Sequence, residues 1–365
     1  MSPGGIIWRR SREGGAVVSS LLLNLACLVV VIAGIKACTS VIVPFLLSAF
    51  FAVLASPLLF WLRKKGLPDW FSIVFLIILF ILLETGLGAL LGTSVAEFTR
   101  ELPVYQERLG AIYAKLTQFA RQLGFSEMEL AVLHELDVSR IMAFVASTLR
   151  GMGVLITNTF VIVLTLVFML LEAGGMIYKL EALSLLGFEK TKELRLIMDG
   201  INSFFAIKTF TSLLTGLLIW LGLWIQGVDF PALWGVCAFA LNFIPTIGSI
   251  IAAVPAVLLS LVKLGFGHCL VTLAMYVMVN IAVGNILEPK LMGQGVGLSP
   301  LVIFLSMAFW GWVLGPVGMF LSVPITMSIK IAMGVHERTR WLSVLLGTNS
   351  EAAKLLKRVE EVAKN

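Results

Sequence analysis

Residues 285–331 form a strongly apolar stretch that contains several residues known to interrupt helices. Pro289 is followed by a glycine-rich link, and the later apolar run is broken at residues 315–318 and again at Pro324. A soluble core helix does not tolerate two prolines, because each removes a backbone hydrogen bond. A membrane segment does so where neighbouring helices satisfy the freed groups, and interrupted apolar segments are typical of transporter binding sites. The stretch therefore indicates a polytopic membrane protein of the transporter class.

The composition of the whole chain agrees with a membrane class. Hydrophobic residues make up 59% of the 365 residues and charged residues only 13%, against about 45–50% and about 25% in soluble proteins. The net charge of +6 gathers at the ends of apolar runs, where basic residues orient a membrane protein. We expect an all-α, polytopic integral membrane protein with about eight transmembrane helices, in contact with lipid and without a nucleic-acid partner.

The first half of the chain predicts four spans, at residues 17–35, 41–62, 70–95 and 152–171. Basic clusters before the first span and after the second place both of these segments in the cytoplasm. Between the third and fourth spans, residues 97–150 are rich in charge and carry apolar residues at helical spacing. They predict an amphipathic helical insertion on the extracytoplasmic side.

The second half predicts four more spans, at about residues 204–225, 232–262, 270–287 and 298–331. The sixth is interrupted at residues 242–248 and the eighth at Pro316, so each is either a kinked span or a broken, re-entrant helix whose end faces a polar ligand. Residues 172–199 predict an amphipathic helix along the inner surface. Eight crossings place both termini in the cytoplasm of a multi-pass protein.

These spans divide the chain into four parts. Residues 1–96 hold the cytoplasmic N-terminal segment and the first three membrane helices. Residues 97–150 form the insertion, residues 151–334 the membrane region with the broken helices, and residues 335–365 a cytoplasmic helical tail.

No catalytic pattern is found in the sequence. The three histidines are far apart, the four cysteines are scattered without paired spacing, and neither a phosphate-binding loop nor a dinucleotide fingerprint is present. We expect no enzyme activity, no cofactor and no metal site. Any uphill transport must then draw on an ion or solute gradient, or on a partner.

Ionisable residues inside apolar runs are costly and usually functional, and three are candidates for ion coupling. Glu288 is either half of an interfacial pair with Lys290 or a titrating, cation-binding group. Lys208 either reaches the interface or contacts the transported solute. Glu84 is either a packed or interfacial carboxyl or a second coupling group.

Three asparagines in or beside the apolar runs, Asn242, Asn280 and Asn285, offer both hydrogen-bond donors and acceptors. They can bind a polyhydroxylated solute or link helices to one another.

Three pieces in the last third of the chain, NFIPTIGSIIAAVP, GNILEPKLMGQGVGLSP and WGWVLGPVGMFLSVP, resemble the autoinducer-2 exporter family of permeases, and the remainder resembles it in layout. The resemblance implies a secondary transporter that exports a small polar signal molecule, autoinducer-2, across the bacterial inner membrane. It also implies a homo-oligomer, with a pentamer as one candidate, in which part of each subunit moves against a scaffold.

The resemblance assigns motif positions in this chain, which we take as solute-binding or gating candidates together with the three asparagines. They are Pro245, Gly248, Glu288, Pro289, Gly315, Pro316, Gly318 and Pro324.

Two other functions stay open. Some family members exchange sodium or lithium for protons, which here would depend on Glu288, although the sequence shows no obvious cluster of carboxylates. A non-transporting scaffold would instead bind a partner through residues 97–150.

Overall fold

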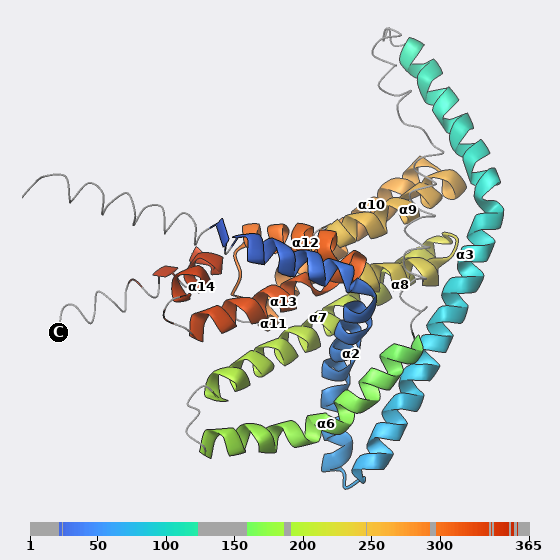
Figure 1. The fold of residues 1–365 in the computed structure, drawn as a ribbon. Helices are drawn as coiled ribbons and strands as arrows, with labels where there is room; N and C mark the ends of the chain where they lie inside the picture. The colour runs from blue at the N-terminus through green and yellow to red at the C-terminus, as the bar shows by residue number, and fades with distance from the viewer. Residues whose placement is uncertain are drawn as a thin grey trace, which may run out of the picture.

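The computed structural model describes residues 22–23, 25–122, 159–185, 191–245, 247–292, 297–335, 337, 339–349, 352–353 and 356. Within these residues every regular element is a helix (Figure 1). Six helices are long and apolar enough to cross a membrane, and four shorter helices are also apolar. This arrangement confirms the predicted all-α, polytopic membrane class.

The first two helices follow one another more continuously than the sequence predicts. A helix at Leu25–Ala37 leads through Cys38 into α2 (Thr39–Lys64), and α2 continues through Pro44. The Ser48 hydroxyl of α2 lies 3.0 Å from the Ile162 carbonyl oxygen, a contact that ties α2 to α6 (Thr159–Leu185).

The third span belongs to α3 (Asp69–Gln122), a single helix of 54 residues (Figure 1). The expected end of the third span at residue 95 is wrong, because α3 continues into the predicted insertion and passes through Pro103 without ending. Phe98, Tyr105 and Leu109 explain this continuity, since they lie on one helical face and pack in a buried cluster with Trp234. Residues 123–150 of the predicted insertion lie outside the described residues.

α6 and α7 (Thr191–Gln226) also extend beyond the predicted spans. The amphipathic helix expected at residues 172–199 is therefore wrong as a separate element, because the described residues of this stretch belong to the end of α6 and the start of α7. The predicted tail helix from residue 348 lies mostly outside the described residues.

The sixth predicted span forms a hairpin of two helices, α8 (Pro231–Leu241) and α9 (Ile247–Leu264). Asp229, just before α8, forms an ion pair with Lys263 in the last turn of α9, so the start of α8 and the end of α9 lie together. With 11 residues, α8 is only about 16 Å long, roughly half the apolar thickness of a bilayer. This geometry favours the re-entrant alternative over a kinked span.

The eighth predicted span is a second hairpin, formed by α12 (Pro300–Leu314) and α13 (Pro316–Val335). Lys330 of α13 hydrogen-bonds the Gly297 carbonyl just before α12, and Trp310 Nε1 donates to Thr326 Oγ1 at 3.1 Å across the pair. The predicted break at Pro316 is confirmed. The second break, expected at Pro324, is wrong, because α13 runs through this buried proline.

The seventh span is one continuous helical path whose winding changes along its length. α10 (Phe266–Val279) passes into a π-helix, η1 (Asn280–Leu287), and then into the short α11 (Glu288–Met292). After the second hairpin, α14 (Arg340–Leu346) returns to the start of α12, where the Ser299 amide donates to the Leu346 carbonyl.

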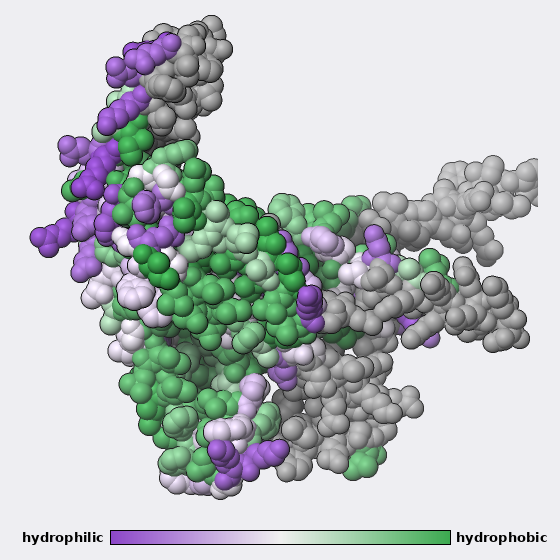
Figure 2. Space-filling model, turned by 180° about the vertical axis from the view of Figure 1, so that it is seen from behind, coloured by the Kyte–Doolittle hydropathy of each residue, from purple (hydrophilic) through white to green (hydrophobic). Residues whose placement is uncertain are grey.

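The tips of the two hairpins meet in an aromatic cluster. The ring centroids of Phe243, at the first tip, and Phe320, just beyond the second, lie 4.6 Å apart, and Phe50 of α2 contacts both rings. The open ends of the hairpins point away from each other (Figure 1). The face shown in Figure 2 is largely hydrophobic, with hydrophilic side chains gathered along the C-terminal half of α3.

Candidate solute site

A buried stripe of polar side chains runs along α7. Lys208, Thr211, Ser212 and Thr215 follow the i, i+3, i+4, i+7 spacing that places side chains on one helix face. Thr211 and Ser212 are fully buried, and Lys208 and Thr215 are almost so. Hydrogen-bonding groups buried at this depth need partners, since an unpaired polar group in an apolar medium costs several kcal/mol.

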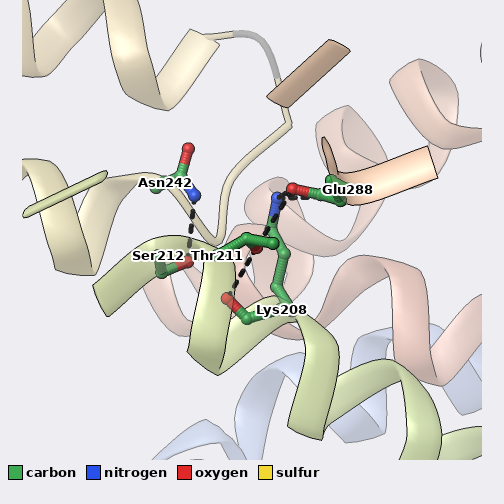
Figure 3. A network of polar contacts seen from close by, with 5 residues as sticks. All are labelled: Lys208, Thr211, Ser212, Asn242 and Glu288. Carbon is green, nitrogen blue, oxygen red and sulfur yellow. Dashed lines mark hydrogen bonds and ion pairs between the residues drawn. The ribbon is translucent and has the colours of Figure 1, made fainter. Parts of the chain in front are cut away.

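Lys208 finds its partner in Glu288, where η1 passes into α11. Its Nζ lies 2.9 and 3.0 Å from the two carboxylate oxygens, and Thr211 Oγ1 donates to the same carboxylate at 3.3 Å (Figure 3). The side chains of Lys208 and Glu288 are only 7% and 16% exposed. Two opposite charges at this depth are tolerable because each compensates the other.

This pairing corrects two alternatives left open by the sequence. Glu288 pairs with Lys208, which is 80 residues away in the chain, rather than with its neighbour Lys290, which is exposed. Lys208 is buried rather than extended to the interface. The ion pair therefore joins α7 to the helix that leads into the second hairpin.

The first hairpin meets the α7 stripe through Asn242, the residue that ends α8. Its Nδ2 donates to Ser212 Oγ at 3.0 Å (Figure 3). Beyond this contact lies a small gap of about 10 Å³, enough for one water molecule. Five of its bordering residues have hydrogen-bonding side chains: Thr215, Asn242, Ser249, Tyr276 and Asn280. Asn242 and Asn280, predicted as separate candidates, thus border the same gap.

The two hairpins close their tips in similar ways. Each second helix carries, in its first turn, a glycine that lies against the first helix. A Cβ at Gly248 would overlap the Leu241 carbonyl oxygen, and one at Gly318 would overlap that of Trp310. Pro245 lies in the segment that connects α8 to α9. Pro316 is the first residue of α13 and follows Gly315, whose φ is 70°. These motif positions shape the hairpins, and only Asn242 among the tip candidates contributes a hydrogen bond to the stripe.

The remaining sequence candidates lie elsewhere. Asn285 and Pro289 are exposed, and Pro324 is buried inside α13. Glu84 of α3 accepts a hydrogen bond from Thr159 of α6 and takes no part in the Lys208–Glu288 pair. Among the residues that the structure describes, no three His, Cys, Asp or Glu side chains gather as a metal site requires.

The sequence interpretation missed Thr211, Ser212, Thr215, Ser249 and Tyr276 as members of this site. The helical spacing of the three α7 residues relative to Lys208 was a usable signal, because hydroxyl groups recur on one face of an apolar helix. A similar spacing links Tyr276 to Thr272 and Asn280, which lie four residues before and after it. No such spacing marks Ser249, which reaches the gap through the packing of α9 against α10.

Known proteins resemble this chain over nearly its whole length. The model of the AI-2E family transporters matches residues 25–338. The AI-2 transport protein TqsA of Escherichia coli is 36% identical over 326 residues, which cover 89% of this chain and 95% of TqsA. The candidate transport protein YhhT of the same organism is 35% identical over 341 residues, covering 92% and 96% of the two chains. A candidate transport protein of Haemophilus influenzae is 39% identical over 332 residues, covering 89% and 95%.

The family match and the fold agree. Helices fit to cross a membrane surround a buried polar stripe, and the two broken segments contact it or each other. The chain is a multi-pass membrane transporter that belongs to the AI-2E family.

Proposed function

We propose that this transporter exports a small, uncharged, polar solute of the autoinducer-2 kind across the bacterial inner membrane by alternating access. The observation that carries the proposal is the buried polar line from Glu288 and Lys208 along α7 to Asn242 and Asn280, beside the meeting hairpin tips. Hydroxyl and amide groups at this depth offer a polyhydroxylated solute the hydrogen bonds that it loses on leaving water.

The hairpin tips supply the part that moves in this proposal. Their contact is mostly apolar and aromatic, through Phe243, Phe320 and Phe50, so parting the tips breaks few directional bonds. The gap beside Asn242 has room for only one water molecule, which corresponds to a closed site. We infer that solute enters when one hairpin shifts relative to α7, and that the Lys208–Glu288 pair holds α11 in place.

The relatives and the charge pattern support the remaining parts of the proposal. TqsA is by name an AI-2 transport protein, and the basic clusters around the first spans favour cytoplasmic termini. We also propose a homo-oligomer, with a pentamer as the first state to test by cross-linking in the membrane.

A sodium or lithium/proton antiporter is the second candidate, because Glu288 is a carboxylate buried at membrane depth. The Lys208 ammonium already occupies that carboxylate, and an incoming cation must displace it. This competition makes antiport the weaker interpretation. Neutralisation of Glu288 should abolish antiport, whereas export of an uncharged solute does not require the charge of this carboxylate.

Flux in proteoliposomes loaded with autoinducer-2 tests the proposal. We expect saturable release by the native protein and at least a tenfold loss in Asn242→Leu, with little loss in the matched variant Asn285→Leu, because Asn285 is exposed outside the site. Sodium-dependent collapse of an imposed pH gradient, abolished by Glu288→Gln and accompanied by no release of autoinducer-2, would move the function to antiport.

A further inference from the structure

The seventh span changes its winding immediately before the buried ion pair. α10 gives way at Asn280 to the π-helix η1, which runs for eight residues to Leu287, and Glu288 follows directly. π-helices are rare, appear mostly as single turns, and are frequent at functional sites. An eight-residue π-helix that ends at the carboxylate of the candidate site therefore requires an explanation.

The hydrogen-bond register of η1 determines which residue faces α7. The Glu288 amide donates to the Val283 carbonyl, five residues earlier, so these two residues lie one wide turn apart on the same side of the helix. Among the eight residues of η1, only Val283 is buried, with 2% exposure. The wide turn thus brings the Glu288 carboxylate onto the buried face, where the Lys208 ammonium lies 2.9 Å from it.

An ordinary α-helix would turn a different residue toward α7. With 3.6 residues per turn, each residue advances about 100°, so Glu288 would lie about 140° around the helix from Val283. Leu287, four residues after Val283, would take the place that meets Lys208. The π winding is therefore what gives a carboxylate, and not a leucine, to the ion pair.

Two residues weaken the α alternative in this segment. Gly284 has a low helix propensity, and Pro289 removes a donor and places its ring against the Asn285 carbonyl of an α-helix. Proline alone does not widen a helix, because α2 and α3 stay α-helical through Pro57 and Pro103. In η1 the wide winding also gains the ion pair, and little packing opposes it, since most of its residues are at least partly exposed.

We propose that η1 is the positioning element of the Lys208–Glu288 pair, because its π winding turns residue 288, rather than residue 287, toward α7. A change of η1 to α winding would turn the carboxylate away from Lys208 and rotate α11, which leads toward the second hairpin. The importance of this positioning for transport rests on the proposed function, whereas the winding is tested on the pair itself.

The test uses the effect of Lys208→Met on the melting temperature of the full-length protein in detergent, which reports whether a carboxylate faces Lys208. In the native protein we expect a loss of about 5 °C, because Glu288 is left buried without its counter-charge. Exchange of two neighbours, Leu287→Glu/Glu288→Leu, should turn this loss into a gain, since the unpaired charge is then Lys208 itself. Exchange of two exposed residues, Asn285→Ile/Ile286→Asn, is the matched control and should preserve the loss.

Deletion of Ile286 gives the complementary result. It places the carboxylate four residues after Val283, so an α winding now brings it to Lys208, and we expect Lys208→Met to lower the melting temperature as in the native protein. The deleted side chain is 48% exposed, so little packing is lost. The exchange variant keeps the chain length and decides alone if the deletion variant does not fold.

Two outcomes would overturn the proposal. One is an exchange variant in which Lys208→Met lowers the melting temperature as much as in the native protein. The other is a folded deletion variant in which Lys208→Met no longer lowers it. Neither outcome depends on solute flux, so a failure of the export proposal would leave this result unchanged.

Discussion

The two hairpins share a construction and differ in what they present to the rest of the protein. Both begin with a proline, turn back on themselves through a glycine contact, and bring a lysine near the open end into contact with the segment that precedes the hairpin. The α8–α9 tip offers Asn242 to the α7 stripe, whereas the α12–α13 tip offers the apolar Val317 and Phe320 to a hydrophobic cluster. The first hairpin therefore adds a hydrogen-bonding group to the polar stripe, and the second hairpin adds apolar packing.

The ion pair between Lys208 of α7 and Glu288 of α11 lies outside both hairpins and gives the largest expected effect. Lys208→Met leaves a buried carboxylate without its counter-charge, and we expect a loss of about 3–5 kcal/mol in stability. The double variant Lys208→Met/Glu288→Gln should recover most of this loss, since no net charge stays buried. Thermal unfolding in detergent measures both, and a double variant no better than the single one would contradict a compensating pair.

Gly248 and Gly318 test whether the two hairpins are built alike. Gly248→Ala and Gly318→Ala each place a Cβ against a main-chain carbonyl, and we expect each to cost about 1–3 kcal/mol through overpacking. Gly86→Ala in α3 is the control, because a Cβ there meets nothing within 4 Å. Melting temperatures provide the measurement, and a large loss at only one glycine would break the equivalence of the hairpins.

The contact between the tips predicts a measurable coupling. The Phe243 and Phe320 rings lie 4.6 Å apart, and such pairs contribute roughly 0.5–1.5 kcal/mol beyond their buried area. A double-mutant cycle with Phe243→Leu and Phe320→Leu should recover a coupling of this size from unfolding measurements. Additive effects of the two substitutions would show that the tips do not depend on each other.

The open end of the first hairpin gives the smallest effect. The Lys263 side chain is 38% exposed, and ion pairs with this exposure contribute less than about 1 kcal/mol. Lys263→Met should therefore lower the melting temperature only slightly, and added salt should reduce the difference from the native protein. A loss as large as that of Lys208→Met would contradict the distinction between the buried and the accessible pair.

The sequence predicts the membrane class and the positions of the broken segments well, because long apolar runs and the Pro–Gly interruptions at residues 242–248 and 315–318 are local signals. It predicts helix ends poorly. The charge change at Glu97 indicates a new element, yet α3 continues because Phe98 and Tyr105 pack against the end of the first hairpin. Pro324 indicates a break, yet buried packing keeps α13 whole.

The sequence indicates several individual residues of the candidate site, but it does not indicate which of them contact one another. Glu288, Lys208 and Asn242 stand out as polar residues in or beside apolar runs. Their partners do not, because Lys208 and Glu288 are 80 positions apart and Asn242 and Ser212 are 30 apart. Only the packing of α7 against η1 and the first hairpin shows that these three residues belong to one polar line.

The most direct test of the central claim, that solute passes along the α7 stripe, is the reactivity of a single cysteine at Thr215. The four native cysteines are replaced by alanine, transport of autoinducer-2 is verified, and membrane-impermeant thiol reagents are applied from either side. We predict modification from both sides, slowed by autoinducer-2, with no slowing at a control Gly110→Cys, which is exposed in the charged half of α3. A transporting variant whose Thr215→Cys thiol stays unreactive, or reacts without protection by the solute, would contradict the account.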